Sequence, residues 1–192
     1  MRIFVLLISL LMAAAAQAAP AAPSDDMDRF LADKGLLARI ETVRQTVSEK
    51  ASLLVFTSMG FLGVPYRRGG NTVETGFDCS GFVKAMFEQT VGKVLPRKAE
   101  QQAAATEKID RADLKPGDLV FFNTMRRAFS HVGIYIGEGK FIHSPKPGSE
   151  VRVEDMGLSY WSRRFDGARR VPASATDAAA NPASPAVESP AK

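Results

Sequence analysis

The sequence predicts an α+β fold, because patterns typical of helices come before patterns typical of paired strands. Apolar residues recur every three or four positions along residues 36–58 and again along residues 79–90, as they do on one face of a helix. Later in the chain, two short runs rich in β-branched and aromatic residues are separated by Gly137-Glu138-Gly139, which is typical of a hairpin. We therefore expect a domain that combines helices with antiparallel strands.

The other elements are predicted from turn residues and short apolar runs. The helix that begins at Cys79 should end at Gly92, and a second, weaker helix should open at Leu95-Pro96 and run to residue 105. Residues 65–71 should form a turn-rich loop that leads to the Cys79 helix. Short strands are expected at residues 119–122, 131–136, 140–144, 151–153 and 168–171.

Residues 1–18 have the pattern of a secretory signal peptide, with Arg2, an apolar stretch and the cleavage motif Ala16-Gln17-Ala18. The apolar stretch is short for a membrane span, and no basic stop-transfer segment follows it. No cysteine lies near the cleavage point, which excludes attachment as a lipoprotein. We therefore expect an exported protein, periplasmic or secreted, that begins at Ala19 and has no stable membrane anchor.

The rest of the chain divides into three parts by composition. Residues 19–58 should be a leader and an N-terminal helical region, with a break near Gly35, and residues 59–171 should form one domain. The helix at residues 36–58 is interpreted as packing scaffold, with binding of a partner as the alternative. Residues 172–192 are rich in Ala, Pro and Ser and should form a disordered tail.

Composition excludes several classes of function. The chain has no phosphate-binding loop, no metal-ligand spacing and no aromatic platform for nucleic acid. The formal net charge is only +4, and removal of the signal takes away only Arg2. A charge this small fits polyanionic surroundings such as a cell envelope, but it also fits ordinary solubility.

Cys79 is the only cysteine, so it cannot form a disulfide within the chain. Asp78 suits the N-cap of the following helix, which places Cys79 in the first turn. There the positive end of the helix dipole is expected to lower the pKa of a thiol. The alternative is a small apolar side chain in the core, and Cys79 alone does not decide between the two. In an exported protein, an odd cysteine indicates intermolecular pairing or a working thiol.

The two histidines, His131 and His143, lie on the two strands of the predicted hairpin. With a three-residue loop, Gly133 pairs with His143, and His131 lies diagonal to His143 on the same face. A two-residue loop would place the histidines on opposite faces. Gly133 has no side chain and leaves room for both rings. A thiol at a helix tip and two imidazoles on one sheet face form the arrangement that a thiol protease needs, since one imidazole takes the thiol proton and a third polar group orients that imidazole.

Four motifs in this order resemble the NlpC-type, papain-like cysteine peptidases of the bacterial cell wall, over about residues 59–171. The motifs are Pro65-Tyr66-x-x-Gly69-Gly70, Asp78-Cys79-Ser80-Gly81-Phe82, Leu114-Lys115-Pro116-Gly117-Asp118-Leu119-Val120-Phe121-Phe122 and His131-Val132-Gly133-Ile134-Tyr135-Ile136-Gly137.

The resemblance implies a papain-like α+β fold in which the nucleophile helix packs on a small antiparallel sheet. It also implies hydrolysis of amide bonds in peptidoglycan stem peptides, without a metal ion or organic cofactor. Cys79 corresponds to the nucleophile, His131 to the general base and then acid, and His143 to the orienting third residue. The backbone N–H of Cys79, at the helix start, is a natural oxyanion donor.

Three further positions match substrate-binding residues of the family. Tyr66 matches a tyrosine that lines the site near the cysteine, and Asp78 and Ser80 match positions that hold the amino end of the stem in some relatives. Only residues 19–58 precede the catalytic region after export, which leaves no room for a wall-binding domain and puts the scissile bond in doubt. We expect cleavage of the cross-links between stem peptides. The sequence carries no signal for an oligomeric state.

Three alternatives remain open from the sequence. The enzyme could cut within a single stem, at the bond from D-Glu to the diamino acid. It could instead be a wall amidase or an acyltransferase on the same scaffold. The third alternative is a non-catalytic protein that binds the envelope, which has no need of Cys79, His131 and His143 together.

Overall fold

The computed structural model describes residues 36–172 of the chain. The expected signal peptide, the leader with its break near Gly35 and the expected tail after residue 172 lie outside the described residues. Of the described residues, 43–172 belong to one compact unit, which contains the sheet and the candidate site. No helix of the described part is long and apolar enough to cross a membrane.

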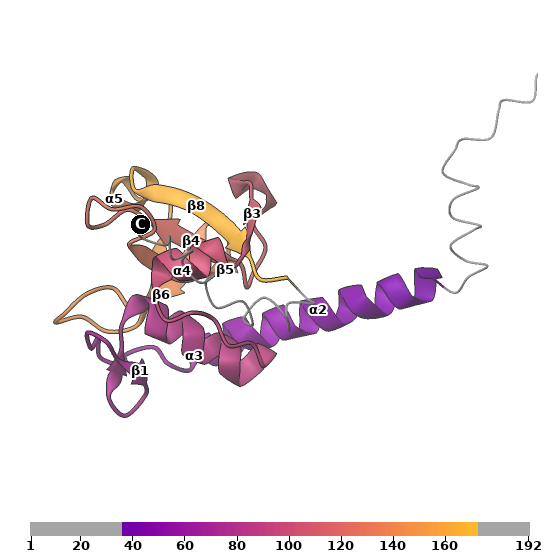
Figure 1. The fold of residues 1–192 in the computed structure, drawn as a ribbon, viewed down its shortest axis with the longest axis horizontal. Helices are drawn as coiled ribbons and strands as arrows, with labels where there is room; N and C mark the ends of the chain where they lie inside the picture. The colour runs from indigo at the N-terminus through magenta and orange to yellow at the C-terminus, as the bar shows by residue number, and fades with distance from the viewer. Residues whose placement is uncertain (1–35, 173–192) are drawn as a thin grey trace, which may run out of the picture. The chain divides into compact units, whose positions relative to one another are not determined.

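The unit is built around a six-stranded antiparallel sheet with the strand order β3-β8-β4-β5-β6-β7. Strands β3, β4, β5, β6 and β8 of this sheet are labelled in Figure 1. Consecutive strands β4 to β7 are neighbours, and β8 returns to pair with β4. The strands are β3 Glu107–Ile109, β4 Leu119–Phe122, β5 His131–Gly137, β6 Lys140–His143, β7 Arg152–Asp155 and β8 Phe165–Arg170. A separate two-stranded sheet pairs β1 (Asn71–Thr72) with β2 (Gly76–Phe77).

Helix α3 (Cys79–Val91) packs against β5 and buries Phe82, Val83, Met86 and Phe87. The Asp78 carboxylate caps it by accepting the Gly81 N–H at 2.8 Å, and Gly92 ends it in the left-handed conformation. The helix start also lies against the loop before β1, because a Cβ on Gly81 would come within 2.1 Å of the Gly70 carbonyl oxygen. The predicted arrangement of the Cys79 helix on an antiparallel sheet is therefore confirmed.

The two faces of the sheet carry separate apolar clusters, as the period of a strand requires. On β4, Leu119 and Phe121 face α3, whereas Val120 and Phe122 face the other cluster. That second cluster contains Phe141, Met156 and Trp161. Trp161 comes from the short helix α5 (Ser159–Ser162), which the sequence analysis did not predict.

The helix predicted to start at Leu95-Pro96 starts later in the chain, so its predicted start is wrong. Helix α4 runs from Ala99 to Ala104, with Lys98 at its N-cap. The segment before it makes contacts of its own: the Pro96 carbonyl accepts from the Gln102 side chain at 2.9 Å, and the Arg97 guanidinium donates to the Asp78 carboxylate at 2.7 Å.

Several other boundaries also differ from the predictions. β7 starts and ends later than the expected strand at residues 151–153, and β8 starts at Phe165 rather than at residue 168. The expected loop at residues 65–71 ends on β1, and β3 and a 3-10 turn at Arg111–Asp113 were not predicted. Apart from the six-residue β8, these elements are only two to four residues long and carry little periodicity, and the strands among them pair with segments that short local patterns do not reveal.

Helix α2 (Leu36–Met59) buries less than its pattern predicted. Of its described side chains, only Leu54 and Ser58 are buried, and Val47 is exposed although it belongs to the expected apolar stripe. Phe56 is 78% exposed. The interpretation as packing scaffold therefore fits the last turns of the helix alone.

Candidate active site

Cys79 is the first residue of α3 and is partly exposed as a whole residue, while its thiol lies against the backbone of Val132 at the start of β5. The backbone N–H groups of Val132, Ser80 and Cys79 itself act on the sulfur, and each of them lowers its pKa. Burial outweighs these groups, and together with the charge of Asp78 it raises the pKa of the Cys79 thiol to about 11. The expectation that the helix dipole leaves this thiol with a lowered pKa is therefore wrong.

The two histidines contact each other directly. The Nε2 atom of His131 lies 2.6 Å from the Nδ1 atom of His143, which is a hydrogen bond whose direction depends on the tautomers. Both rings are buried beside Trp161, and the His131 ring stacks on the indole with centroids 5.5 Å apart. This contact engages Nε2 of His131, so Nδ1 is its other ring nitrogen.

The hairpin that carries the histidines has the predicted register at their end, but its turn differs. Gly137 pairs with Lys140 around the two-residue turn Glu138-Gly139, in which both residues have positive φ. Ile136 forms a bulge, so that Tyr135 pairs with Phe141 and Ile134 with Ile142. The bulge supplies the extra residue that brings the histidines back to one face, which a plain two-residue turn would have prevented.

Gly133 lies between the two histidine positions, where a side chain has no room. A Cβ at this position would lie 2.6 Å from the Phe141 ring and 3.2 Å from the Cβ of His143. The expectation that Gly133 leaves space for the rings agrees with this geometry.

Burial lowers the pKa of both imidazoles. His131 has a pKa well below 6.5 because of burial and the neighbouring His143, and burial also lowers the pKa of His143, against the opposing effect of Glu154. Burial thus disfavours charge on Cys79, His131 and His143 alike. The free protein should hold a neutral thiol and two neutral imidazoles.

Asp78 and Ser80 come together, but their polar atoms are already engaged by Arg97. The Arg97 guanidinium donates to both carboxylate oxygens of Asp78 at 2.9 and 2.7 Å and to the Ser80 hydroxyl at 3.0 Å. The Asp78 carboxylate also accepts the N–H groups of Gly69 and Gly81. No motif in the sequence marks Arg97, and the only signal is a basic residue directly after Leu95-Pro96.

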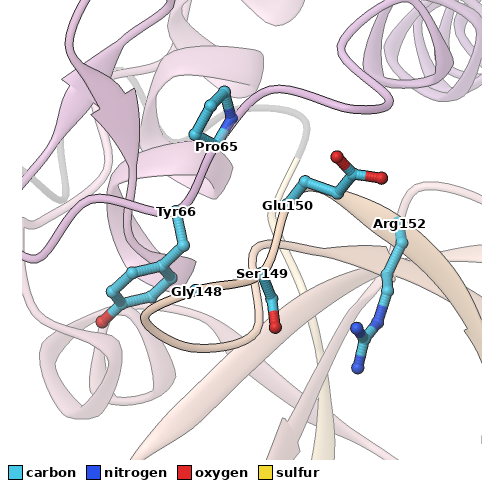
Figure 2. Close-up of a pocket in the computed structure, with 6 residues that line it drawn as sticks. All are labelled: Pro65, Tyr66, Gly148, Ser149, Glu150 and Arg152. Carbon is cyan, nitrogen blue, oxygen red and sulfur yellow. The ribbon is translucent and has the colours of Figure 1, made fainter.

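Tyr66 lies near the thiol, since burial and then the charge of Cys79 raise the pKa of its phenol. Its backbone N–H donates to the Ser149 carbonyl at 2.7 Å, which joins the β1 side of the site to the loop before β7. An open pocket of about 480 Å³ lies there, and in Figure 2 Tyr66 and Arg152 lie on either side of Ser149. Sequence analysis missed this wall, which is formed by Gly148, Ser149, Glu150 and Arg152.

Among residues 36–172, no three His, Cys, Asp or Glu side chains are grouped so that they could hold a metal ion.

Alkylation of Cys79 should become faster as the pH rises through the alkaline range, because only the thiolate reacts and the pKa of the thiol is raised to about 11. Asp78→Asn should shift the profile to lower pH, since the charge of Asp78 contributes to that rise. Rates of iodoacetamide labelling between pH 5 and 10 measure both profiles. A plateau already below pH 7 would show a preformed thiolate–imidazolium pair instead. Slow labelling at neutral pH therefore does not distinguish a catalytic thiol from a passive one.

The helix that presents the thiol, the antiparallel sheet and the histidine pair together define the fold of the papain-like cysteine peptidases. The model of the NlpC/P60 family matches residues 63–170, and the chain belongs to that family. The resemblance stated from the sequence is confirmed.

Known relatives of the family show the extent of the similarity. The chain is 45% identical over 113 residues to the murein DD-endopeptidase MepH of Escherichia coli (strain K12), a match over 57% of this chain and 42% of that protein. It is also 45% identical over 111 residues to the gamma-DL-glutamyl hydrolase of Bacillus subtilis (strain 168), over 57% of this chain and 27% of that protein. The chain thus spans less than half the length of either relative.

A solved structure supports the fold. The crystal structure of an NlpC/P60 family protein from Bacillus cereus ATCC 10987 superposes with a TM-score of 0.58 at 35% identity, over 62% of this chain and 39% of that one.

Proposed function

We propose that this protein is an exported cysteine peptidase that hydrolyses amide bonds in peptidoglycan stem peptides, with the cross-link as its target. The observation that carries the proposal is the Cys79 thiol at the start of α3, against the backbone of Val132, which follows His131 on β5, together with a His131 ring that is hydrogen-bonded to His143. The family membership and the murein endopeptidase among the relatives support the choice of substrate. Removal of residues 1–18 during export is part of the same proposal.

In the proposed mechanism, the Cys79 sulfur attacks the scissile carbonyl carbon while His131 Nδ1 takes the thiol proton. The charge that develops on the carbonyl oxygen is stabilised by the Cys79 N–H at the helix start. His131 then gives its proton to the leaving amine, and an acyl-enzyme remains. A water molecule that loses a proton to His131 attacks this thioester, which releases the carboxylate product and returns the proton to the sulfur.

Burial of the Cys79 thiol and of the His131 imidazole suits a mechanism in which the proton moves during the attack on the substrate. Because the resting thiol and imidazole are neutral, the proton moves as the bond to the substrate forms. His131 must therefore be unprotonated before each cycle, and its lowered pKa keeps it so at neutral pH.

The environment of Asp78 favours cross-links over single stems as the substrate. A free stem amine bound by Asp78 would have to displace Arg97, which already donates to both oxygens of this carboxylate. A cross-linked peptide needs no such amine site. The names of the two relatives differ in the bond that is cut, so they do not choose between the alternatives.

Purified muropeptides provide the test of the substrate. Incubation with the protein should convert dimeric muropeptides to monomers with intact stems, as measured by mass spectrometry of the products. Persistence of the dimers while single stems are shortened would reject the cross-link and support cleavage from D-Glu to the diamino acid.

Asp78→Asn separates the two roles of this residue. If Asp78 serves only as helix cap and partner of Arg97, the variant should have a lower melting temperature and an unchanged KM for trimmed stems. A rise of KM confined to stems with a free amine would instead assign Asp78 to substrate binding. Gln102→Ala is a suitable control, because it removes another anchor of this region, on the Ser80 carbonyl, without touching the carboxylate.

A further inference from the structure

Glu154 on β7 lies directly behind the histidine pair. Its backbone pairs with Phe141, and its Oε1 atom lies 3.7 Å from Nε2 of His143, within the range of an ion pair but longer than a hydrogen bond. His143 is fully buried, and within the described part of the chain its Nε2 atom makes no hydrogen bond of ordinary length. The Glu154 carboxylate is therefore the group that this nitrogen faces.

Two other side chains hold the carboxylate in place. The Trp161 indole N–H donates to Oε2, and the Arg152 guanidinium donates to Oε1. The contact with His143, followed by those with Trp161 and Arg152, lowers the pKa of Glu154 to about 2 against the opposing effect of burial. Glu154 is thus ionised at neutral pH and acts only as an acceptor.

The tautomers follow from this acceptor. A carboxylate beside Nε2 of His143 favours the proton on that nitrogen, which leaves Nδ1 with a lone pair. Nδ1 can then only accept in the 2.6 Å bond to His131, so Nε2 of His131 must donate. The proton of neutral His131 is thereby held on Nε2, and its Nδ1 carries the lone pair needed for the thiol proton.

We propose that Glu154 is a positioning residue that sets the tautomers of both histidines and so keeps Nδ1 of His131 available as the base. Glu154 acts through His143 and touches neither the thiol nor the substrate. This inference rests on the proposed function, because the base is needed only if Cys79 attacks a substrate. A glutamate that merely anchored Trp161 and Arg152 would stabilise the fold without changing the tautomers.

Nuclear magnetic resonance tests the tautomers without any substrate. The chain has two histidines, so long-range proton–nitrogen spectra of the ¹⁵N-histidine-labelled protein can be assigned with one His143→Asn variant. We expect protonated Nε2 and unprotonated Nδ1 on both rings at pH 7.5. Glu154→Gln should mix or reverse the His143 tautomers, because the side-chain amide can donate to Nε2. A wild-type His143 protonated on Nδ1, or wild-type tautomers retained in Glu154→Gln, would overturn the proposal.

Glu138→Gln is the matched control for this substitution. Glu138 lies on the turn of the same hairpin, with its side chain 88% exposed and paired only with Lys140 among the contacts described. Its replacement should leave the histidine spectrum and the activity as in the wild type. A change in the Glu138→Gln spectrum as large as that of Glu154→Gln would overturn a specific role for Glu154.

Kinetics provide the second readout. Glu154→Gln should lower kcat on muropeptides by roughly ten- to a hundredfold, the size of the loss known for metal-bound histidines that lose their orienting partner, with KM unchanged. In the His143→Asn background, the same substitution should cause no further loss, because no imidazole remains for Glu154 to orient. Losses that simply multiply would contradict the proposal. If the wild type turns over no muropeptide, the proposed function fails, and the histidine spectra still decide the role of Glu154.

Discussion

Replacement of Cys79 by alanine should abolish hydrolysis of peptidoglycan peptides, with a loss of roughly 10⁴-fold or more, while the fold is retained. The sulfur is the proposed attacking atom, and the substitution removes little volume because the two side chains differ by this single heavy atom. The Asp78 cap and the apolar face of α3 do not depend on the thiol. Turnover of muropeptides by the purified variant, together with its melting temperature, measures both expectations.

Cys79→Ser is the companion variant. It should also be nearly inactive, because an alcohol is far harder to ionise than a thiol and burial opposes the charge further. Turnover by Cys79→Ala at the wild-type rate would show that another group attacks the substrate. Such a result would refute the mechanism but not the family membership.

Replacement of His131 by alanine should cause a loss comparable to that of Cys79→Ala. His131 is proposed both to take the thiol proton and to protonate the leaving amine, and these two steps share one ring. His143→Ala should be milder, and His143→Asn or His143→Gln milder still, because either amide can accept from Nε2 of His131. Steady-state kcat and KM of the four variants measure this ranking.

Two results would change the assignment. Equal losses in His143→Ala and His143→Asn would mean that His143 does not act by orientation, and full activity of His131→Ala would remove the base. These comparisons require folded variants at pH 7.5. Below about pH 6.5 the unfolded chain binds protons that the buried histidines resist, so the wild type itself loses stability as the pH falls.

Local patterns were sufficient for the parts of the fold that depend on neighbouring residues. The Cys79 helix, its Asp78 cap and its end at Gly92 follow from capping and periodicity, which act within a few residues. The hairpin register at His131 and His143 was also predicted, although by a different turn from the one that forms.

Only the tertiary structure determined the properties that depend on groups distant in sequence. The pKa of Cys79 is raised, whereas the sequence predicted that it would be lowered. Burial depends on all the atoms that surround the thiol, and here its effect exceeds that of the helix terminus. The bulge at Ile136 depends on pairing across the sheet rather than on the turn sequence.

The sequence by itself determined the family, the α+β class and the three candidate catalytic residues, because these follow from motifs and local spacing. It did not reveal that the Arg97 guanidinium is hydrogen-bonded to the Asp78 carboxylate, 19 residues away along the chain, or that Glu154 lies behind His143. Charged side chains such as these are common on solvated surfaces and carry no local pattern that marks a partner. Their roles arise only when folding removes water and places opposite charges or acceptors beside one another.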